Sequence, residues 1–332
     1  MSDFSVISST ISPADIGLFV SEKYFRVDNS ICHLLKTGIN HTYQVDINNE
    51  SYVFRVYSYD WRTKDEIVEE LNLLNLLKKN SLSVSYPIED KNGNLIQTIE
   101  APEGKRFAVL FSFAHGKKIQ NYTADIHFNI GKLMAQIHSF TRDLKQDRIS
   151  YTSEVLLDQS INYIKQFLST ELEEMQFLIT TKTILEAEIS KTDFTSIRKG
   201  IVHLDIWFDN LNISENGDIA LFDFDFCGNG WLCLDIAYYI LQLHNTEKNE
   251  SARIEKMASF YKGYGTIQKI SVEEMRLVPT LGVCIYYFYL GIQCKRFNNW
   301  SNVFLNETYL KRYITVFIKG YYETTKSETT FL

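Results

Sequence analysis

Residues 201–226 read IVHLDIWFDNLNISENGDIALFDFDF and contain the most informative pattern in this chain. Asp205 follows His203 by two positions, and Asn210 follows Asp205 by five. Asp223 comes thirteen positions after Asn210. An H-x-D-x-x-x-x-N loop with a later aspartate at the end of a strand is the arrangement that phosphoryl transfer to a hydroxyl needs. One carboxylate receives the acceptor's proton, while an amide oxygen and a second carboxylate hold Mg²⁺.

The order of these residues is more informative than any one of them. Asp and Asn favour loops and turns, so each residue alone is better explained by turn chemistry. Here a predicted hairpin of suitable length, with strands over 211–214 and 219–226 and an Asn-Gly turn, separates the members of the set. The ordered set therefore favours catalysis, with Asp205 as the expected base and Asn210 and Asp223 as the expected metal ligands.

Asp225 follows Asp223 by two positions on the same predicted strand. Because side chains alternate along a strand, both carboxylates are expected on one face. Asp225 is then expected to support the metal site or to approach the amine of an acceptor. The alternative is a plain exposed strand residue.

Upstream of this segment, residues 30–115 are predicted to form strands with one inserted helix. Alternating apolar residues indicate the strands, and leucine and isoleucine spaced by three and four indicate the helix. The expected elements are strands over 42–47 and 52–57, a helix over 63–79, an Asn-Gly hairpin with strands near 86–89 and 95–100, and a strand over 107–113. The Ala114-His115-Gly116 stretch that follows is the candidate hinge.

The rest of the chain is predicted to be mainly helical. Apolar residues at helical spacing form one stripe over 126–140 and another over 157–175, and helices dominate again from 234 onward. The sequence thus predicts an α+β protein with a small β-rich N-terminal lobe, residues 1–115, and a larger helical lobe, residues 116–332. This is the outline of a two-lobed protein-kinase-like fold.

The catalytic segment resembles the Brenner motif of the aminoglycoside phosphotransferase, choline kinase and homoserine kinase-like superfamily. Its continuation DFDFCGNGWLCLDIAYYI supplies the Asp-hydrophobic-Ala element of that superfamily at Asp235-Ile236-Ala237. Residues 131–138, GKLMAQIH, resemble its G-x-x-L-A-x-L-H helix, and residues 260–264, FYKGY, resemble its F-x-x-G-Y element. The resemblance covers about residues 30–265 and is greatest to the homoserine kinases built on this fold.

The resemblance implies the same roles for Asp205, Asn210 and Asp223 as the residue pattern does. It also implies that His203 hydrogen-bonds the catalytic loop rather than reacts, and that Asp235 braces this loop from the following helix.

The nucleotide side of the site is less well marked. Gly38, Asn40 and Thr42 lie where a phosphate-covering loop is expected, but the loop has one glycine and fits neither the Walker nor the G-x-G-x-x-G pattern. A kinase strand normally carries a phosphate-binding lysine, and this chain has Arg55 there, which keeps the charge and offers two donors. Its expected carboxylate partner is Glu70, with Glu66 as the second choice.

The backbone of 110–114 is expected to face the nucleotide base, with Phe111 and Phe113 at its edge.

The acceptor pocket is expected in the helical lobe, where aromatic rings can bind a cation and carboxylates can neutralise amines. Aromatic stripes at helical spacing are more often core, and this alternative applies to each candidate. The candidates are the aromatic Tyr286, Tyr287, Tyr289, Phe297 and Trp300 and the acidic Asp158, Glu273 and Glu274.

Composition narrows the class of partner. The 332 residues carry 34 basic and 41 acidic side chains, a net charge of −7, which is the wrong sign for nucleic-acid binding. Five cysteines without a C-x-x-C pair argue against a disulfide framework or a zinc site, and the N-terminus shows no secretory signal, so the cytoplasm is expected. The apolar run over 280–294 is too short to span a bilayer and is expected to be a buried helix, not a membrane contact.

Together these observations predict a small-molecule kinase that passes the γ-phosphate of MgATP or MgGTP to an acceptor hydroxyl. Homoserine-like amino alcohols are favoured over aminoglycosides as acceptors, and the protein is expected to be a monomer or homodimer. Two alternatives remain: a stress-type Ser/Thr protein kinase of the same fold, and a nucleotide-binding scaffold with weak catalysis. The absence of a long activation segment ending in Ala-Pro-Glu disfavours the first, and the intact Asp205, Asn210 and Asp223 disfavour the second.

Overall fold

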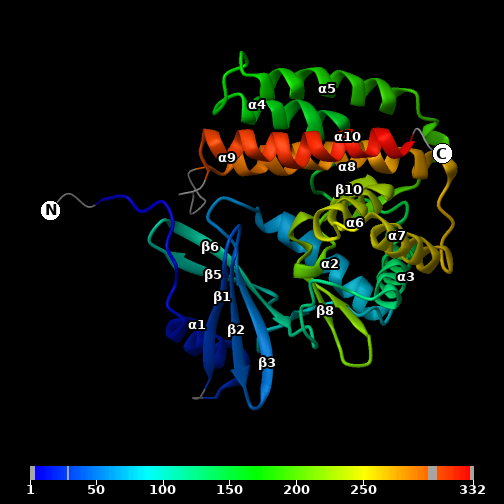
Figure 1. Ribbon diagram of the computed structural model, residues 1–332. Helices are drawn as coiled ribbons and strands as arrows, with labels where there is room; N and C mark the ends of the chain where they lie inside the picture. Colours follow the sequence, from blue (N-terminus) through cyan, green and yellow to red (C-terminus); the bar gives the residue numbers. More distant parts are fainter. Residues whose placement is uncertain (1–3, 28–29, 298–304, 330–332) are drawn as a thin grey trace. The chain divides into compact units, whose positions relative to one another are not determined.

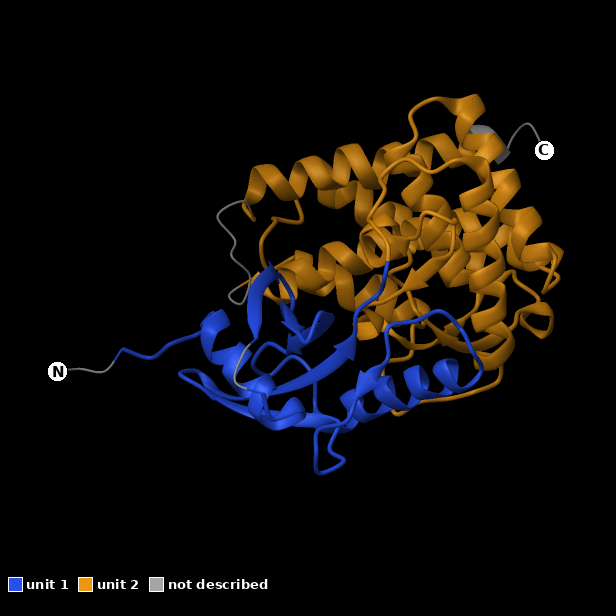
Figure 2. Cartoon of the chain, turned by 90° about the horizontal axis from the view of Figure 1, so that it is seen from below, with its two compact units in different colours: residues 1–115, 298–301 blue, residues 116–297, 302–332 orange. Residues whose placement is uncertain are grey.

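The computed structural model describes residues 4–27, 30–297 and 305–329 (Figure 1). The described residues divide into two compact units, with the division between His115 and Gly116 (Figure 2). Unit 1, the N-terminal part, is built on a β-sheet, and unit 2, the C-terminal part, is mostly helical. The predicted α+β class is therefore confirmed.

Unit 1 contains a six-stranded antiparallel sheet in the order β1-β2-β3-β6-β4, with β5 also paired to β6. The predicted hairpin is formed by β2 and β3, whose Asn48 and Asn49 adopt φ of 52° and 65°, as a type I′ turn requires. The elements are α1 Pro13–Val20, a π-helical turn Ser21–Phe25, β1 Ile31–Thr37, β2 His41–Ile47, β3 Glu50–Val56, α2 Lys64–Lys79, β4 Pro87–Ile88, β5 Ile96–Ala101 and β6 Gly104–Ser112.

The predicted helix of unit 1 is α2, and its buried face carries the expected apolar residues. It begins at Thr63 with a capping box. The Thr63 hydroxyl accepts the Glu66 N–H at 3.2 Å, and Glu66 Oε2 accepts the Thr63 N–H at 2.9 Å. Local sequence chemistry therefore fixes where this helix starts.

The predicted hairpin between the strands near 86–89 and 95–100 is wrong. Strands β4 and β5 each pair with β6, opposite Phe111 and Val109 respectively, and the structure pairs neither with the other within the described residues. The turn between them closes on itself, because Asp90 Oδ1 accepts the N–H groups of Asn92 and Asn94, both at 2.8 Å. The actual hairpin joins β5 to β6 and was not predicted.

Unit 2 is helical with two small antiparallel strand pairs, β8–β9 and β7–β10. The β8–β9 hairpin was predicted, whereas the pairing of β7 with β10 was not. The helices are α3 Ala124–Thr141, α4 Ser160–Ile164, α5 Glu173–Ser190, α6 Cys233–Thr246, α7 Glu250–Gly265, α8 Val272–Lys295, α9 Glu307–Arg312 and α10 Gly320–Thr329, with π-helical turns Glu154–Gln159 and Tyr313–Lys319. The strands are β7 Lys199–Val202, β8 Leu211–Ile213, β9 Ile219–Leu221 and β10 Gly228–Trp231, and 3₁₀ turns occupy Phe194–Ser196, Phe208–Asn210 and Phe224–Phe226.

The single apolar stripe predicted over 157–175 is interrupted, because α4 ends at Ile164 and α5 begins at Glu173. Polar side chains in the break and in the first turn of α5 bind backbone groups of the break. The Ser169 hydroxyl accepts the Glu171 N–H at 3.3 Å, and the Gln176 side chain donates to the Thr170 carbonyl at 2.7 Å.

Helices α3 and α7 approach closely through two glycines. A Cβ at Gly131 would collide with the carbonyl oxygen of Phe260, and one at Gly263 would collide with that of Phe128. Both glycines belong to the stretches that resemble superfamily elements. In this chain, glycine at these two positions allows α3 and α7 to pack closely.

Helix α8 is long and apolar enough to cross a membrane by length and composition alone, but 78% of its most apolar window is buried inside the protein. The expectation of a buried helix is therefore confirmed.

Candidate active site

The catalytic segment forms a loop between β7 and β8 in which Asp205 and Asn210 are in contact. Asn210 Nδ2 donates to Asp205 Oδ2 at 2.7 Å and to the Asp205 carbonyl oxygen at 2.9 Å. Asn210 is buried, whereas Asp205 is partly exposed. The amide nitrogen of Asn210 is bound to Asp205, and the other polar atom of the side chain is an acceptor oxygen.

His203 hydrogen-bonds the loop, as the resemblance implies. Its Nδ1 accepts the Asp205 N–H at 3.1 Å, and its Nε2 lies 3.2 Å from the Phe222 carbonyl oxygen. These partners assign the proton to Nε2 in a neutral ring. His203 is buried, and backbone groups engage both of its ring nitrogens.

Asp235 on α6 braces the loop from behind. Its Oδ2 accepts the His203 N–H at 2.9 Å, and its Oδ1 accepts the Leu204 N–H at 2.6 Å. Leu204 has a φ of 62°, a conformation that a branched residue adopts only when its surroundings hold it there. Asp235 therefore contacts this loop from the following helix, as the resemblance implies.

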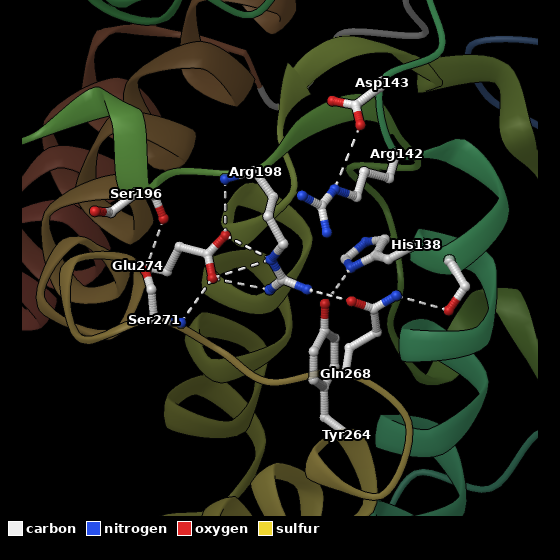
Figure 3. Close-up of polar contacts among 10 residues, drawn as sticks. His138, Arg142, Asp143, Ser196, Arg198, Tyr264, Gln268, Ser271 and Glu274 are labelled. Carbon is white, nitrogen blue, oxygen red and sulfur yellow. Dashed lines mark hydrogen bonds and ion pairs between the residues drawn. The ribbon is translucent and has the colours of Figure 1, made fainter.

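Asp235 is linked through His138 to further polar side chains, and Figure 3 shows the part of these contacts that joins His138, Tyr264, Arg198 and Glu274. His138 Nε2 lies 3.1 Å from Asp235 Oδ2, and His138 Nδ1 lies 2.7 Å from the Tyr264 hydroxyl. The Arg198 guanidinium carbon lies 5.5 Å from the centre of the Tyr264 ring, and its nitrogens donate to Glu274 at 2.8–3.1 Å. The stretch containing His138 was noted only for its resemblance to a superfamily helix, and the contacts of Arg198 were not predicted.

Asp223 follows β9 after one residue and adopts a left-handed conformation, with a φ of 66°. The chain then enters a 3₁₀ turn at Phe224–Phe226. The predicted strand over 219–226 therefore ends early, and the strand-face argument for Asp225 is wrong. Asp225 is 2% exposed, so the alternative of an exposed strand residue is also wrong.

Residues 146–151 hold the segment that follows Asp223. The Arg148 side chain donates to the Asp225 carbonyl at 2.5 Å, and the Tyr151 hydroxyl donates to the Phe226 carbonyl at 2.5 Å. Asn229 exchanges hydrogen bonds with the backbone of Gln146, at 2.9 and 3.0 Å. Nothing in the local sequence signals these long-range contacts.

Two tyrosines contact Asp205. Tyr238 was not predicted, and Tyr289 was predicted only as an acceptor candidate. The Tyr238 hydroxyl donates to Asp205 Oδ1 at 2.5 Å. The Tyr289 hydroxyl donates to the Leu204 carbonyl at 2.8 Å and lies 3.3 Å from Asp205 Oδ1. Burial, and then the charge of Asp205, raise the pKa of both phenols well above the usual value. Both hydroxyls therefore keep their protons and remain donors.

In unit 1, Arg55 pairs with Glu70, the first-choice partner. Arg55 Nη1 lies 2.8 Å from Glu70 Oε1, the Tyr57 hydroxyl donates to Glu70 Oε2 at 3.0 Å, and Glu70 is fully buried. The Phe111 ring centre lies 5.0 Å from the Arg55 guanidinium carbon. Glu66, the second choice, is instead part of the α2 capping box.

The other nucleotide-side candidates also lie in unit 1. Asn40 is buried and its Oδ1 accepts the Ser58 N–H at 3.2 Å, so it shapes the turn after Gly38. Thr42 lies opposite Arg55 in the β2–β3 pairing. Phe113 follows the end of β6, and its ring lies 6.0 Å from that of His115.

Several of the acceptor candidates have protein partners, and two of them are fully buried. Glu274 is fully buried and binds Arg198 and the Ser271 cap, and Tyr287 is fully buried with its hydroxyl on the Leu178 carbonyl at 3.0 Å. Asp158 forms an ion pair with Lys182 at 2.7 Å. Trp300 lies outside the described residues.

The remaining candidates have assigned contacts as well. The Tyr286 hydroxyl donates to Asn245 at 2.6 Å, Glu273 pairs with Arg276 at 2.9 Å, and the Phe297 ring packs on Phe167 with centres 4.6 Å apart. Of the described candidates, Tyr289 is the one with a contact to Asp205.

The donor set suits Mg²⁺. Mg²⁺ is typically held by one or two protein carboxylates together with substrate phosphates and water, and not by a dedicated protein cage. Within the described ranges, no group of three or more His, Cys, Asp or Glu side chains forms such a cage. The carboxylate of Asp223 and the amide oxygen of Asn210 are the hard oxygen donors that this ion prefers.

A family model and individual relatives both match this chain. The model of the phosphotransferase enzyme family matches residues 33–269. An uncharacterized protein of Synechocystis sp. is 30% identical over 319 residues, which cover 93% of this chain and 85% of that protein. A homoserine kinase of Polaromonas naphthalenivorans is 22% identical over 262 residues, covering 74% of this chain and 75% of the kinase.

Solved structures of kinases share the fold. A microcompartment-associated aminopropanol kinase superposes with a TM-score of 0.75 at 19% identity, covering 93% of this chain and 95% of its own. The amicoumacin kinase hAmiN, solved with AMP-PNP, Ca²⁺ and its antibiotic, gives 0.76 at 17% identity, covering 95% and 94%. The predicted kinase-like fold is confirmed by these likenesses.

Proposed function

The chain belongs to the phosphotransferase enzyme family, and we propose that it transfers the γ-phosphate of ATP or GTP to a hydroxyl of a small amine-bearing acceptor. The observation that carries this proposal is the contact of Asn210 with Asp205 in a loop held by Asp235, with Asp223 placed in a left-handed turn after the next hairpin. This arrangement contains a proton acceptor and two oxygen donors for a cation.

In the proposed reaction the acceptor oxygen forms a bond to the γ-phosphorus, and the bond from that phosphorus to the β–γ bridging oxygen breaks. Asp205 receives the proton of the acceptor hydroxyl. Asn210 and Asp223 would hold Mg²⁺, which supplies charge neutralisation of the phosphates when bound. Arg55, oriented by Glu70, is proposed to bind phosphate oxygens, and Gly38, Asn40, Thr42, Phe111 and Phe113 are proposed to shape the nucleotide side.

The acceptor is proposed to be an amino alcohol. Relatives named as homoserine kinases, and the solved aminopropanol and choline kinases, are named for substrates that carry a hydroxyl together with an amine or, in choline, a quaternary ammonium. The partial exposure of Asp205 leaves it accessible to such a molecule. All five cysteines are free thiols, which supports a proposed location in the reducing cytoplasm.

A coupled nucleotide-turnover assay tests this proposal. MgATP and MgGTP are each offered with homoserine, aminopropanol, choline, amino sugars and aminoglycosides, and turnover is expected with an amino alcohol. Asp205→Asn is expected to lower turnover about 10²-fold or more, since the proton acceptor is lost, while nucleotide binding measured by calorimetry survives.

Three results would contradict the proposal. Near-normal turnover by Asp205→Asn would remove Asp205 from its role. Nucleotide binding without transfer to any acceptor would favour a scaffold, and transfer to a generic protein substrate would favour a protein kinase.

A further inference from the structure

Asp205 is held by protein donors on both carboxylate oxygens. Asn210 donates to Oδ2 at 2.7 Å, and Tyr238 on α6 donates to Oδ1 at 2.5 Å. The Tyr289 hydroxyl on α8 lies 3.3 Å from Oδ1 and makes its shorter hydrogen bond to the Leu204 carbonyl, at 2.8 Å. Two buried helices thus meet at one partly exposed carboxylate.

Such a carboxylate does not need a phenol for solvation. Asp205 is partly exposed, so water could satisfy Oδ1. Water, however, would let the carboxylate rotate, whereas a short charge-assisted bond from a rigid, 3%-exposed side chain fixes its plane. The rings of Tyr238 and Tyr289 lie 5.6 Å apart, which limits the movement of the Tyr238 hydroxyl further.

We propose that Tyr238 is a positioning residue for phosphoryl transfer, which holds Asp205 at the angle from which it receives the acceptor's proton. This inference rests on the proposed function. In the transfer step the proton moves from the acceptor oxygen to Asp205, and Tyr238 keeps its own proton throughout. The raised pKa of the phenol is consistent with that, because it keeps Tyr238 a donor.

The chain offers a matched control in the next residue. Tyr239 is also on α6, is 2% exposed, and has its hydroxyl 2.7 Å from His127 Nδ1. Each of the changes Tyr238→Phe and Tyr239→Phe removes one buried hydroxyl and leaves the ring in place. The first removes the bond to Asp205 and the second the bond to His127. If Tyr238 has a purely structural role, the two changes should affect kcat similarly. If Tyr238 is a positioning residue, Tyr238→Phe should lower kcat more than Tyr239→Phe.

The experiment measures kcat and KM for MgATP and for the acceptor found in the turnover screen, together with the thermal midpoint of each full-length variant. Tyr238→Phe is expected to lower kcat about tenfold or more, with the KM for MgATP unchanged, because the lost bond is to a charged group in the reacting set. Tyr239→Phe is expected to keep kcat and to lower the thermal midpoint by at least as much as Tyr238→Phe. Tyr289→Phe is expected to lower kcat less than Tyr238→Phe, because its main partner is a backbone carbonyl.

Three results would overturn the inference and leave the proposed function standing, and two of them concern Tyr238→Phe directly. These are an unchanged kcat in Tyr238→Phe, and parallel losses in Tyr238→Phe and Tyr239→Phe that follow the loss of thermal stability. A loss in Tyr289→Phe that exceeds the one in Tyr238→Phe would assign the role to Tyr289 and also overturn it. If the wild-type protein turns over no acceptor and does not hydrolyse MgATP, the proposed function itself fails, which the wild-type measurement identifies before any variant is compared.

Discussion

For Arg55, the sequence predicted a partner, Glu70, and the structure contains that ion pair. The position on β3 predicted a phosphate-binding cation, and Glu70 was the first choice for its partner. The structure gives that pair a 2.8 Å contact with Glu70 fully buried. A buried arginine facing a buried carboxylate is costly to disturb, because the charge that remains has been removed from water.

Glu70→Ala is accordingly expected to lower the free energy of unfolding by about 3 kcal/mol, since a buried guanidinium loses the carboxylate that faces it. Urea denaturation followed by circular dichroism measures this change. Asp65→Ala is the control, because Asp65 is an exposed acid in the first turn of the same helix and its loss should cost about 0.5 kcal/mol. Equal losses in the two variants would show that the ion pair contributes no special stability.

At the scale of the element, two helices start with the same local chemistry in different surroundings. Both α2 and α8 begin with a capping box, made by Thr63 with Glu66 and by Ser271 with Glu274. Glu66 is partly exposed, whereas Glu274 is fully buried and also accepts three hydrogen bonds from the Arg198 side chain (Figure 3). Glu66 also meets a cation, but through one contact with Arg62 at 3.4 Å. Glu274 is itself buried and holds Arg198 through three shorter bonds, at 2.8–3.1 Å.

We therefore expect Glu66→Ala to cost about 1 kcal/mol of unfolding free energy, as a lost cap does, and Glu274→Ala to cost about 3–5 kcal/mol. The second variant removes the cap and the carboxylate that neutralises Arg198. Urea denaturation of both variants at one pH provides the comparison. A loss below 1.5 kcal/mol in Glu274→Ala would contradict a dominant role for the Arg198 pair.

The elements that were predicted correctly are those whose signals are local. The β2–β3 hairpin, the β8–β9 hairpin and α2 are fixed by turn residues, alternation and capping within a few positions. The errors arise where a distant segment supplies the partner. Strand β6 pairs with both β4 and β5. Residues 146–151 bind the chain after Asp223 in a turn, which the alternation of apolar residues does not predict.

The same distinction applies to the site when the whole molecule is considered. Asp205, Asn210 and Asp223 lie within nineteen positions of one another, so their spacing made them recognisable. Tyr238 and Tyr289 contact Asp205 from 33 and 84 positions away, on helices whose aromatic residues also fill the core. Only the packing of α6 and α8 tells which of these rings contact Asp205.

Both units contain a buried histidine that resists protonation. Burial, and then the charge of Arg106, lower the pKa of His41 in unit 1 to about 4. Burial, and then the charge of Lys256, lower the pKa of His127 in unit 2 to about 4. The usual value in an unfolded chain is about 6.5. Between these two values the unfolded chain binds more protons than the folded protein, so the free energy of unfolding falls as the pH is lowered.

The folded protein is therefore expected to lose stability from about pH 6.5 downward, by up to roughly 2 kcal/mol per histidine at pH 5. Urea denaturation of the full chain at pH 7 and pH 5 measures the loss. His41→Asn and His127→Asn remain neutral at both pH values, so each should reduce the loss by its own share, and the double variant should reduce it most. A wild-type protein equally stable at pH 7 and pH 5, or variants that lose as much as wild type, would show that these histidines do not govern the acid sensitivity.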